Sequence, residues 1–585
     1  DLHVRSRRQR QMCIRDSIVT GLIILVVIIM GITALINKYT PTKKTEDLKE
    51  YFNISSDDEA ALIVDNELSD YKAKIIDKKI YVDYKFVHDS LNSRFYWDAN
   101  ENVLLYTTAS DIISAAADSN SYSVTKQTND FGYPIVKATS DSALIALDYV
   151  KQYSNITFKS YDDPARIVIT SKWDEIDSAT VSKSTQVRVK GGIKSPILKE
   201  VKKDDKITIL DSGDKWDKVA TEDGVIGYIK SKALSESKKT KLTNPDYEEE
   251  TFTHIKKDKD ICLAWNQVTS QSANSKVPQV ISSTKGINVM SPTWFYLNDN
   301  NGNLADIASK DYVSYCHSQG IEVWGLFSNF ENTDVDAAYV LTHTSTRTTL
   351  INQIMSAAFN YELDGVNIDF ENITEAAYGD SYIEFIRELA IKCHNNGISL
   401  SVDVTVPASF NKFFNRSDMA NFADYIVIMG YDEHYKGSDA GSVSSIPWVT
   451  EGVESTLKEV PADQIILGMP FYTRIWELTP KEDDDAVTDT EDQSKYTVAS
   501  QVYSMDAAAA QLATNNATAA LDEESGQNYA EWSVSNKLYK VWLEDTTSLE
   551  KRLKLVDDNK LAGAAFWKLG FENSSVWDTV IKYLN

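Results

Sequence analysis

Cysteine is scarce in this chain. Its 585 residues include four, which are Cys13, Cys262, Cys316 and Cys393, and no Cys-x-x-Cys pair occurs among them. Disulfide-stabilised scaffolds and zinc modules need closely spaced cysteines, so the wide spacing argues against both classes. We expect isolated, buried thiols that pack as small apolar side chains.

Positive charge is also in short supply. Lys and Arg number 60 against 86 Asp and Glu, which gives a formal net charge of −26. Such an acidic surface would repel a polyanion, which argues against nucleic acid as a partner. An extracellular enzyme that acts on neutral sugar or peptide is compatible with this charge, although the charge does not choose between the two.

Apolar and aromatic residues are plentiful. Hydrophobic residues make up 42% of the chain, with 12 Trp, 30 Tyr and 19 Phe, which is the composition of a folded protein rather than a disordered one. The length exceeds what one compact core accommodates, so we expect two to four domains.

One uncharged run, IVTGLIILVVIIMGITALI, covers residues 18–36. Nineteen residues at 1.5 Å each just span a hydrocarbon core of about 30 Å, so we expect a transmembrane signal anchor. A cleaved signal peptide is the alternative, but its apolar core is usually shorter and no clear small-residue cleavage site follows.

The tail at residues 1–17 contains RSRRQRQMCIRDS, which resembles translated cloning sequence more than native protein. Taken at face value, its arginines would keep the N-terminus cytoplasmic by the positive-inside rule. Foreign arginines would remove that support, and the topology would then follow from where the rest of the chain acts. The basic residues on the two sides of the run are Arg5, Arg7, Arg8, Arg10 and Arg15 before it and Lys38, Lys43 and Lys44 after it.

Residues 46–175 alternate short strands with short helices, and the order of strand, helix, WDA turn and strand resembles the N-terminal domain of copper amine oxidases, which implies an α+β stalk. Residues 181–236 contain five strand-like runs separated by KGG, KKDD, SGDK and EDG turns. This pattern resembles bacterial SH3-like domains, which implies contact with cell-wall peptides; a packing module without a ligand is the alternative. The polar residues 237–251 are expected to form a linker.

Residues 252–585 repeat an apolar strand-like run followed by an amphipathic helical stretch, and eight such runs can be counted. This alternation predicts a parallel (β/α)8 TIM barrel. A doubly wound open sheet would need a glycine-rich phosphate loop after its first strand, and none is present. The stretch at about 477–560 is too long for one loop and predicts a small α+β insertion.

The fourth run, LDGVNIDFENI, places polar residues in an otherwise apolar strand. Side chains alternate along a strand, so Asn367, Asp369 and Glu371 share one face. Polar groups pointing into a barrel carry a desolvation cost that a purely structural strand would avoid. Asp369 should also raise the pKa of Glu371 through like-charge repulsion, as a general acid near neutral pH requires.

DGVNIDFE resembles the DGxDxDxE signature of glycoside hydrolase family 18, the chitinase-like barrels. The stretch KLYKVWLEDTTSLEKRLKLVDDNKLAGAAFWKLG, residues 537–570, further resembles the spore-cortex and wall-lytic N-acetylglucosaminidases of Gram-positive bacteria. MGYD at residues 429–432 and FWKLG around Trp567 are similar to further family motifs. One departure is Asn367, which stands where the family has Asp. We expect its amide still to bond Asp369 and the change to alter pH dependence more than activity.

The resemblance implies roles for individual residues and no metal or cofactor. Glu371 would protonate the glycosidic oxygen, and Asp369 would orient the substrate's own acetamido nucleophile. Tyr431 would bond the acetamido group, Asp432 would contact sugar hydroxyls, and Trp567 would stack under the sugar. Asn367 is included with the catalytic set, and Met429 and Tyr296 with the substrate-binding set.

These expectations describe a membrane-anchored, outward-facing glycosidase that cleaves β-1,4 bonds at N-acetylglucosamine in peptidoglycan. Chitin is the alternative substrate. A protein that binds wall carbohydrate without cleaving it is the alternative class, although the intact Glu371, Asp369 and Tyr431 argue against it.

Overall fold

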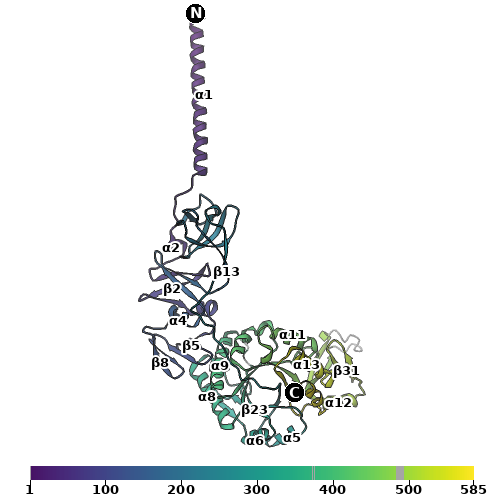
Figure 1. The fold of residues 1–585 in the computed structure, drawn as a ribbon. Helices are drawn as coiled ribbons and strands as arrows, with labels where there is room; N and C mark the ends of the chain where they lie inside the picture. Colours follow the sequence, from purple (N-terminus) through teal and green to yellow (C-terminus); the bar gives the residue numbers. More distant parts are fainter. Residues whose placement is uncertain (1, 372, 374–375, 482–492, 585) are drawn as a thin grey trace. The chain divides into compact units, whose positions relative to one another are not determined.

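The computed structural model describes residues 2–371, 373, 376–481 and 493–584, without the side chains of residues 2–14 and 376–377 (Figure 1). The chain divides into two compact units, one of Asp1–Ser93 with Ile135–Glu249 and one of Arg94–Pro134 with Glu250–Asn585. The buried Cys262, Cys316 and Cys393 are free thiols, as expected, whereas the side chain of Cys13 lies outside the described residues.

The chain begins with helix α1 (Leu2–Tyr39), which contains the expected span at residues 18–36. Its segment Arg15–Tyr39 has a mean hydropathy of 2.9 and no buried residue. By length and composition it is, among the described residues, the one helix able to cross a membrane, and a signal sequence shares both properties.

Two seven-stranded sheets build the first unit, in the orders β11-β12-β1-β2-β3-β10-β9 and β15-β14-β18-β17-β16-β13-β19. Phe52 and Ile63 pack in the same core as Val187, Val219 and Ile229, so the regions expected as separate stalk and SH3-like domains share one core. The resemblance of residues 181–236 to SH3-like domains stays a prediction. The strands are β1 (Glu59–Val64), β2 (Glu67–Ile76), β3 (Lys79–Asp83), β9 (Val136–Ala138), β10 (Ala143–Ala146), β11 (Thr157–Tyr161), β12 (Arg166–Thr170), β13 (Glu175–Thr180), β14 (Thr185–Arg188), β15 (Ile197–Val201), β16 (Lys206–Asp211), β17 (Trp216–Thr221), β18 (Ile226–Lys230) and β19 (Lys238–Lys241).

Strand β19 lies inside residues 237–251, which were expected to be a linker. Its side chains are exposed, so they carry no apolar pattern, and the strand forms through backbone pairing with β13. Polar composition alone therefore misidentified this edge strand.

Residues 94–134 correct the expected stalk at 46–175, because they belong to the second unit. They form an antiparallel meander of β4 (Phe95–Asp98), β5 (Val103–Thr107), β6 (Ile112–Ala116), β7 (Ser121–Val124) and β8 (Gln127–Asp130). The meander bonds to two barrel helices, α8 (Thr344–Tyr361) and α9 (Ala376–His394). Asp98 Oδ2 accepts bonds of 2.6 Å from the amide and hydroxyl of Thr344, and the Tyr96 hydroxyl lies 2.9 Å from Ser381 Oγ.

Thr107 offers a test of this attachment. Its buried hydroxyl donates a 2.7 Å bond to Glu384 Oε1 on α9, and burial raises the pKa of Glu384 to about 7. Thr107→Val keeps the shape but removes the donor, and we expect the second unit to lose about 1–3 kcal/mol of unfolding free energy. Urea unfolding measures this loss, and Thr514→Val, at an exposed helix end, is the matched control with a change below about 0.5 kcal/mol. Equal urea-unfolding midpoints for the two variants would show that the Thr107–Glu384 bond does not stabilise the attachment of the meander to α9.

The eight expected barrel strands are present, and LDGVNIDFENI supplies the fourth. They run parallel in chain order, and the barrel closes where the last strand pairs with the first. Helices surround them (Figure 1). The strands are β20 (Ile261–Asn266), β21 (Val289–Leu297), β23 (Glu322–Ser328), β24 (Gly365–Asp369), β25 (Ser399–Thr405), β26 (Tyr425–Met429), β27 (Ile465–Pro470) and β33 (Gly563–Trp567), and β22 (Leu304–Asp306) pairs with the end of β21. The helices besides α8 and α9 are α5 (Val277–Ile281), α6 (Lys310–Ser318), α7 (Ala337–Thr342), α10 (Arg416–Phe422), α11 (Ile446–Thr456), α13 (Thr546–Asn559) and α14 (Val576–Tyr583).

The alternation expected along β24 holds. Val366 and Ile368 pack in the large apolar layer that includes residues of the surrounding helices, while Asn367 and Asp369 point into the barrel. Gly365 occupies a position where a Cβ atom would lie 2.5 Å from the indole of Trp324, so the bulky tryptophan at this level requires glycine.

The expected insertion spans different residues, from Tyr472 to Leu543 rather than about 477–560. Its sheet has the order β29-β28-β32-β31-β30 and carries one helix. Helix α13, which was assigned to the insertion, touches its strand β31 but also contacts β27, β33, α11 and α14, so it packs as a barrel helix. The elements are β28 (Tyr472–Pro480), β29 (Tyr496–Ser504), α12 (Met505–Thr514), β30 (Ala520–Asp522), β31 (Gln527–Val534) and β32 (Lys537–Leu543).

Candidate active site

A cleft of about 940 Å³ lies where the barrel strands end at their carboxyl termini. Seven of the eight residues selected from the sequence line it, as strand periodicity and the family resemblance together predicted. They are Tyr296, Asp369, Glu371, Met429, Tyr431, Asp432 and Trp567.

Glu371 lies just past the end of β24, at the mouth of the cleft. Its backbone amide donates a 3.1 Å bond to Asn329 Oδ1, which fixes the chain at this point. Desolvation within the cleft raises the pKa of Glu371, and the charges of Asp432 and Glu331 raise it further. The repulsion expected between Asp369 and Glu371 raises the pKa of Asp369, whereas the charges that raise the pKa of Glu371 follow strands β23 and β26. A raised pKa suits a proton donor.

Asp369 is buried beside a second carboxyl that the sequence reasoning missed, Asp403 of β25. Ile368 pairs with Val402, so Asp369 and Asp403 follow at the same level on neighbouring strands, which are spaced about 5 Å apart. Burial raises the pKa of both, and the charge of Asp403 raises that of Asp369 further. Two buried carboxyls this close cannot both ionise, so the pair holds a proton.

Asn367 does not bond Asp369, which corrects the sequence expectation. Its Oδ1 accepts bonds from Trp265 Nε1 (2.9 Å) and Ser291 Oγ (3.0 Å). Its Nδ2 donates to Ser401 Oγ (3.0 Å) and Asp403 Oδ1 (2.7 Å). These four bonds use the full capacity of a carboxamide. Asn367 is fully buried beneath the cleft, so it acts through Asp403 rather than on a ligand.

The proton therefore has a preferred place in the pair. The bond from Asn367 favours the ionised form of Asp403 and lowers its pKa against the effect of burial. Asp369 Oδ1, by contrast, is buried without a hydrogen-bond partner among the described residues. The bond from Asn367 therefore favours Asp403 over Asp369 as the ionised member of the pair.

Tyr431 and Asp432 follow β26 and close one side of the site. Burial and the nearby carboxylates, Asp369 foremost, raise the pKa of Tyr431 well above its usual value, so its hydroxyl stays a donor. Asp432 adopts a left-handed backbone with φ of 58°, a region that Asp tolerates. Its Oδ1 accepts a 2.5 Å bond from the Tyr472 hydroxyl and lies 3.6 Å from the Arg474 guanidinium. The first strand of the insertion thus fixes Asp432.

Aromatic rings make up much of the cleft surface. Trp265 packs edge-on against Trp567, with ring centroids 6.0 Å apart, and against Tyr431 at 6.4 Å. Flat faces in an open cleft suit stacking against sugar rings. Sequence reasoning missed four further aromatic lining residues, because they follow the strand ends in loops or short helical segments and carry no strand periodicity: Phe330, Phe410, Tyr435 and Trp448.

The arrangement supports acid catalysis and binding of a neutral ring-shaped ligand. Within the described residues, no group of three or more His, Cys, Asp or Glu could hold a metal ion. His434, two residues after MGYD, contacts the carbonyl of Ser442 and has a loop role.

The comparisons with known proteins agree with this chemistry. The family model described as "Glycosyl hydrolases family 18" matches residues 331–572. "Uncharacterized glycosylase YvbX" of Bacillus subtilis is 24% identical over 48% of this chain and 81% of its own length. "Cortical fragment-lytic enzyme" of Bacillus subtilis is 24% identical over 47% of this chain and 63% of its own, and "Chitinase-like mite allergen Der f 18.0101" of Dermatophagoides farinae is 25% identical over 39% and 50%.

Proposed function

Residues 331–572 form a glycoside hydrolase family 18 domain, and from that premise we propose that this protein hydrolyses β-1,4 bonds at N-acetylglucosamine in peptidoglycan. The observation that carries the proposal is Glu371, whose pKa is raised, at the mouth of an aromatic-lined cleft that also holds a buried carboxyl pair and a buried tyrosine. The similarity to a cortical fragment-lytic enzyme supports peptidoglycan as the substrate.

In this proposal Glu371 gives its proton to the glycosidic oxygen as the bond to the anomeric carbon breaks. The carbonyl oxygen of the substrate's acetamido group attacks that carbon and forms a cyclic oxazolinium ion. The carboxylate of Glu371 then takes a proton from a water molecule. The oxygen of that water attacks the anomeric carbon, and the bond from this carbon to the acetamido oxygen breaks, which opens the oxazolinium ring. Two displacements at one carbon retain its configuration.

Tyr431 donates a hydrogen bond to the acetamido oxygen and keeps it over the anomeric carbon. As positive charge develops on the ring, Asp369 passes its proton to Asp403 and becomes the counter-ion, with its oxygen toward the acetamido N–H. The negative charge of the pair reaches Asp369 only in the transition state, so it stabilises that state selectively. Asp403 therefore takes the place of the carboxyl that Asn367 lacks.

The N-terminal helix and the first unit are proposed to place the barrel at the cell wall. Helix α1 would anchor the chain with its N-terminus in the cytoplasm, and the first unit would hold the barrel at the wall, where residues 181–236 contact wall peptides. The substrate lies outside the cell, which supports this topology.

Chitin is the second candidate substrate, because the mite relative is named as chitinase-like and the cleft recognises the N-acetyl sugar that both polymers share. Mass analysis of the products from purified peptidoglycan and from chitin, each digested with the full chain, tests the proposal. Fragments ending in reducing N-acetylglucosamine from peptidoglycan support it, and products from chitin alone overturn the choice of substrate.

The pH profile provides a separate test through Glu331. Its carboxylate, which accepts 2.7 Å bonds from Ser328 Oγ, raises the pKa of Glu371. Glu371 works as an acid only while protonated, so activity falls as pH rises through its pKa. We expect Glu331→Gln to lower that pKa and move the alkaline limb of kcat to lower pH. If the alkaline limb of kcat stays at the same pH, the charge of Glu331 has no influence on the pKa of Glu371.

A further inference from the structure

The insertion sheet has two faces with different environments. On one face Trp476 and Leu478 are buried in a cluster with Ala440 and Tyr496. The other face packs against helix α12 through Ile475, Val541 and Leu512. Because side chains alternate, this second face points away from Tyr472 and Arg474, the residues of β28 that contact Asp432 of the cleft.

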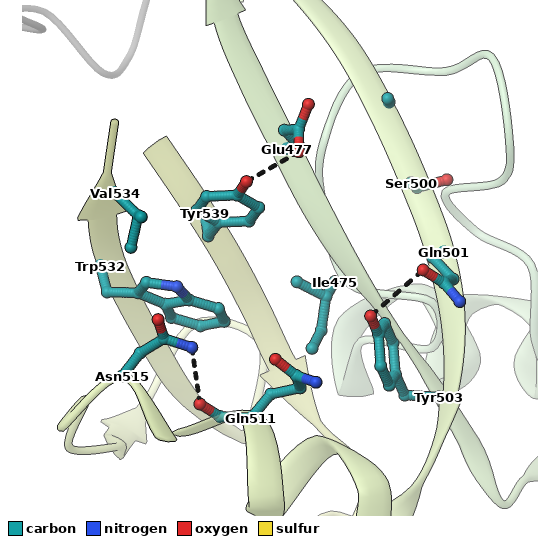
Figure 2. Close-up of a pocket in the computed structure, with 11 residues that line it drawn as sticks. Ile475, Glu477, Ser500, Gln501, Tyr503, Gln511, Asn515, Trp532, Val534 and Tyr539 are labelled. Carbon is teal, nitrogen blue, oxygen red and sulfur yellow. Dashed lines mark hydrogen bonds between the residues drawn. The ribbon is translucent and has the colours of Figure 1, made fainter. Parts of the chain in front are cut away.

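Helix α12 has ten residues and covers only part of its face, and a hollow of about 440 Å³ remains beside it (Figure 2). The hollow takes residues from β28, β29, β31, β32 and the end of α12. Its lining residues are Ile475, Glu477, Ala499, Ser500, Gln501, Tyr503, Gln511, Asn515, Trp532, Val534 and Tyr539.

Aromatic rings and carboxamides dominate this hollow. Trp532 and Tyr539 stack with centroids 5.5 Å apart and planes 8° from parallel. Tyr503 stands opposite, and the side chain of Gln511 extends into the space between Tyr503 and Trp532 (Figure 2). Flat apolar faces with a few amide donors and acceptors form a surface that can contact a sugar ring and bond its hydroxyl and acetamido groups.

Charge in the hollow favours a neutral ligand. None of the eleven lining residues is basic. The one carboxylate, Glu477, is paired with Lys537 Nζ at 2.6 Å and accepts a 2.7 Å bond from the Tyr539 hydroxyl. These bonds lower the pKa of Glu477, so it stays ionised but compensated. An anionic ligand would find no cation among the lining residues.

We propose that this hollow is a second saccharide-binding site, separate from the cleft, for a glycan strand containing N-acetylglucosamine. The inference rests on the proposed function for the identity of the polymer. A site on the outer face of the insertion holds one strand of polymer while the cleft works on another segment, which raises the effective substrate concentration at the barrel.

Calorimetric titration with an N-acetylglucosamine tetrasaccharide tests the site in the full chain carrying Glu371→Gln, which prevents hydrolysis. We expect two sites per chain, and one when Trp532→Ala is added. Gln511→Ala, which removes a polar side chain without opening the core, should weaken the second site about three- to tenfold. Phe359→Ala, at an exposed aromatic of α8, is the matched control and should leave both sites.

The outcomes separate this inference from the proposed function. If one site is seen and Trp532→Ala leaves it unchanged, the second site does not exist. If one site is seen and Trp532→Ala abolishes it, the hollow binds sugar and the cleft does not. Trp532→Ala in the otherwise natural chain should slow digestion of intact peptidoglycan about three- to tenfold while leaving the turnover of short soluble fragments unchanged; equal rates on intact wall would overturn the role.

Discussion

Glu371→Gln should lower kcat on peptidoglycan fragments by about 10²–10⁴-fold, the range that a positioned general acid contributes. Gln has the size of Glu but cannot release a proton to the glycosidic oxygen. The side chain lies at the mouth of the cleft and leaves the aromatic floor intact, so binding of the fragments should change little. Release of reducing ends measures kcat, and calorimetry measures binding.

Glu454→Gln, at an exposed position of α11, is the matched control and should keep full activity. A Glu371→Gln variant as active as the parent would remove Glu371 from the mechanism. A parent that binds both polymers but releases no reducing ends from either would favour the alternative of a wall-binding protein without catalysis.

Asp403→Asn should lower kcat by about 10²-fold, although sequence reasoning did not select this residue. The substitution removes the acceptor for the proton of Asp369. It also removes the charge that raises the pKa of Asp369, so we expect that pKa to fall and the acid limb of the pH profile to move. The kcat–pH profile distinguishes this outcome from simple damage to the fold, which would lower activity equally at every pH.

A double variant that exchanges the amide of Asn367 with the carboxyl of Asp403 tests this role most directly. Asn367→Asp combined with Asp403→Asn returns a carboxyl to the family's position and keeps one amide and two carboxyls in the buried cluster. We expect the double variant to recover at least about tenfold of the activity lost by Asp403→Asn. A double variant no better than the single one would contradict the proposal that Asp403 takes the place of the missing carboxyl.

The architecture of the barrel was predictable because each strand and helix is specified by a pattern within its own stretch of sequence. The apolar runs and the helices between them repeat along the chain, and period-two alternation within LDGVNIDFENI is enough to place Asp369 inside the barrel. The cleft residues followed because parallel strands bring their carboxyl ends to one edge. Asp403 was missed because the sequence of one strand does not show which residue lies beside it on the next strand. Only the register between β24 and β25 shows that Asp403 neighbours Asp369.

Long-range attachment explains the other errors. Nothing near Tyr96 or Thr107 indicates that their partners are Ser381 and Glu384, so the meander was grouped with its neighbours in sequence. The aromatic side chains of Phe330 and Phe410 likewise reach the cleft only through tertiary folding.

During synthesis the meander is made well before the barrel helices to which it bonds. Tyr96 leaves the ribosome 285 residues before Ser381, its partner on α9. At about 5–20 residues per second, this interval lasts roughly 15–60 s. For that period five strands with an unpaired apolar face exist without the barrel, while the chain on both sides of them folds as the first unit. Slower translation would lengthen the exposure, and a chaperone that holds extended chains would be of most use to this protein in that interval.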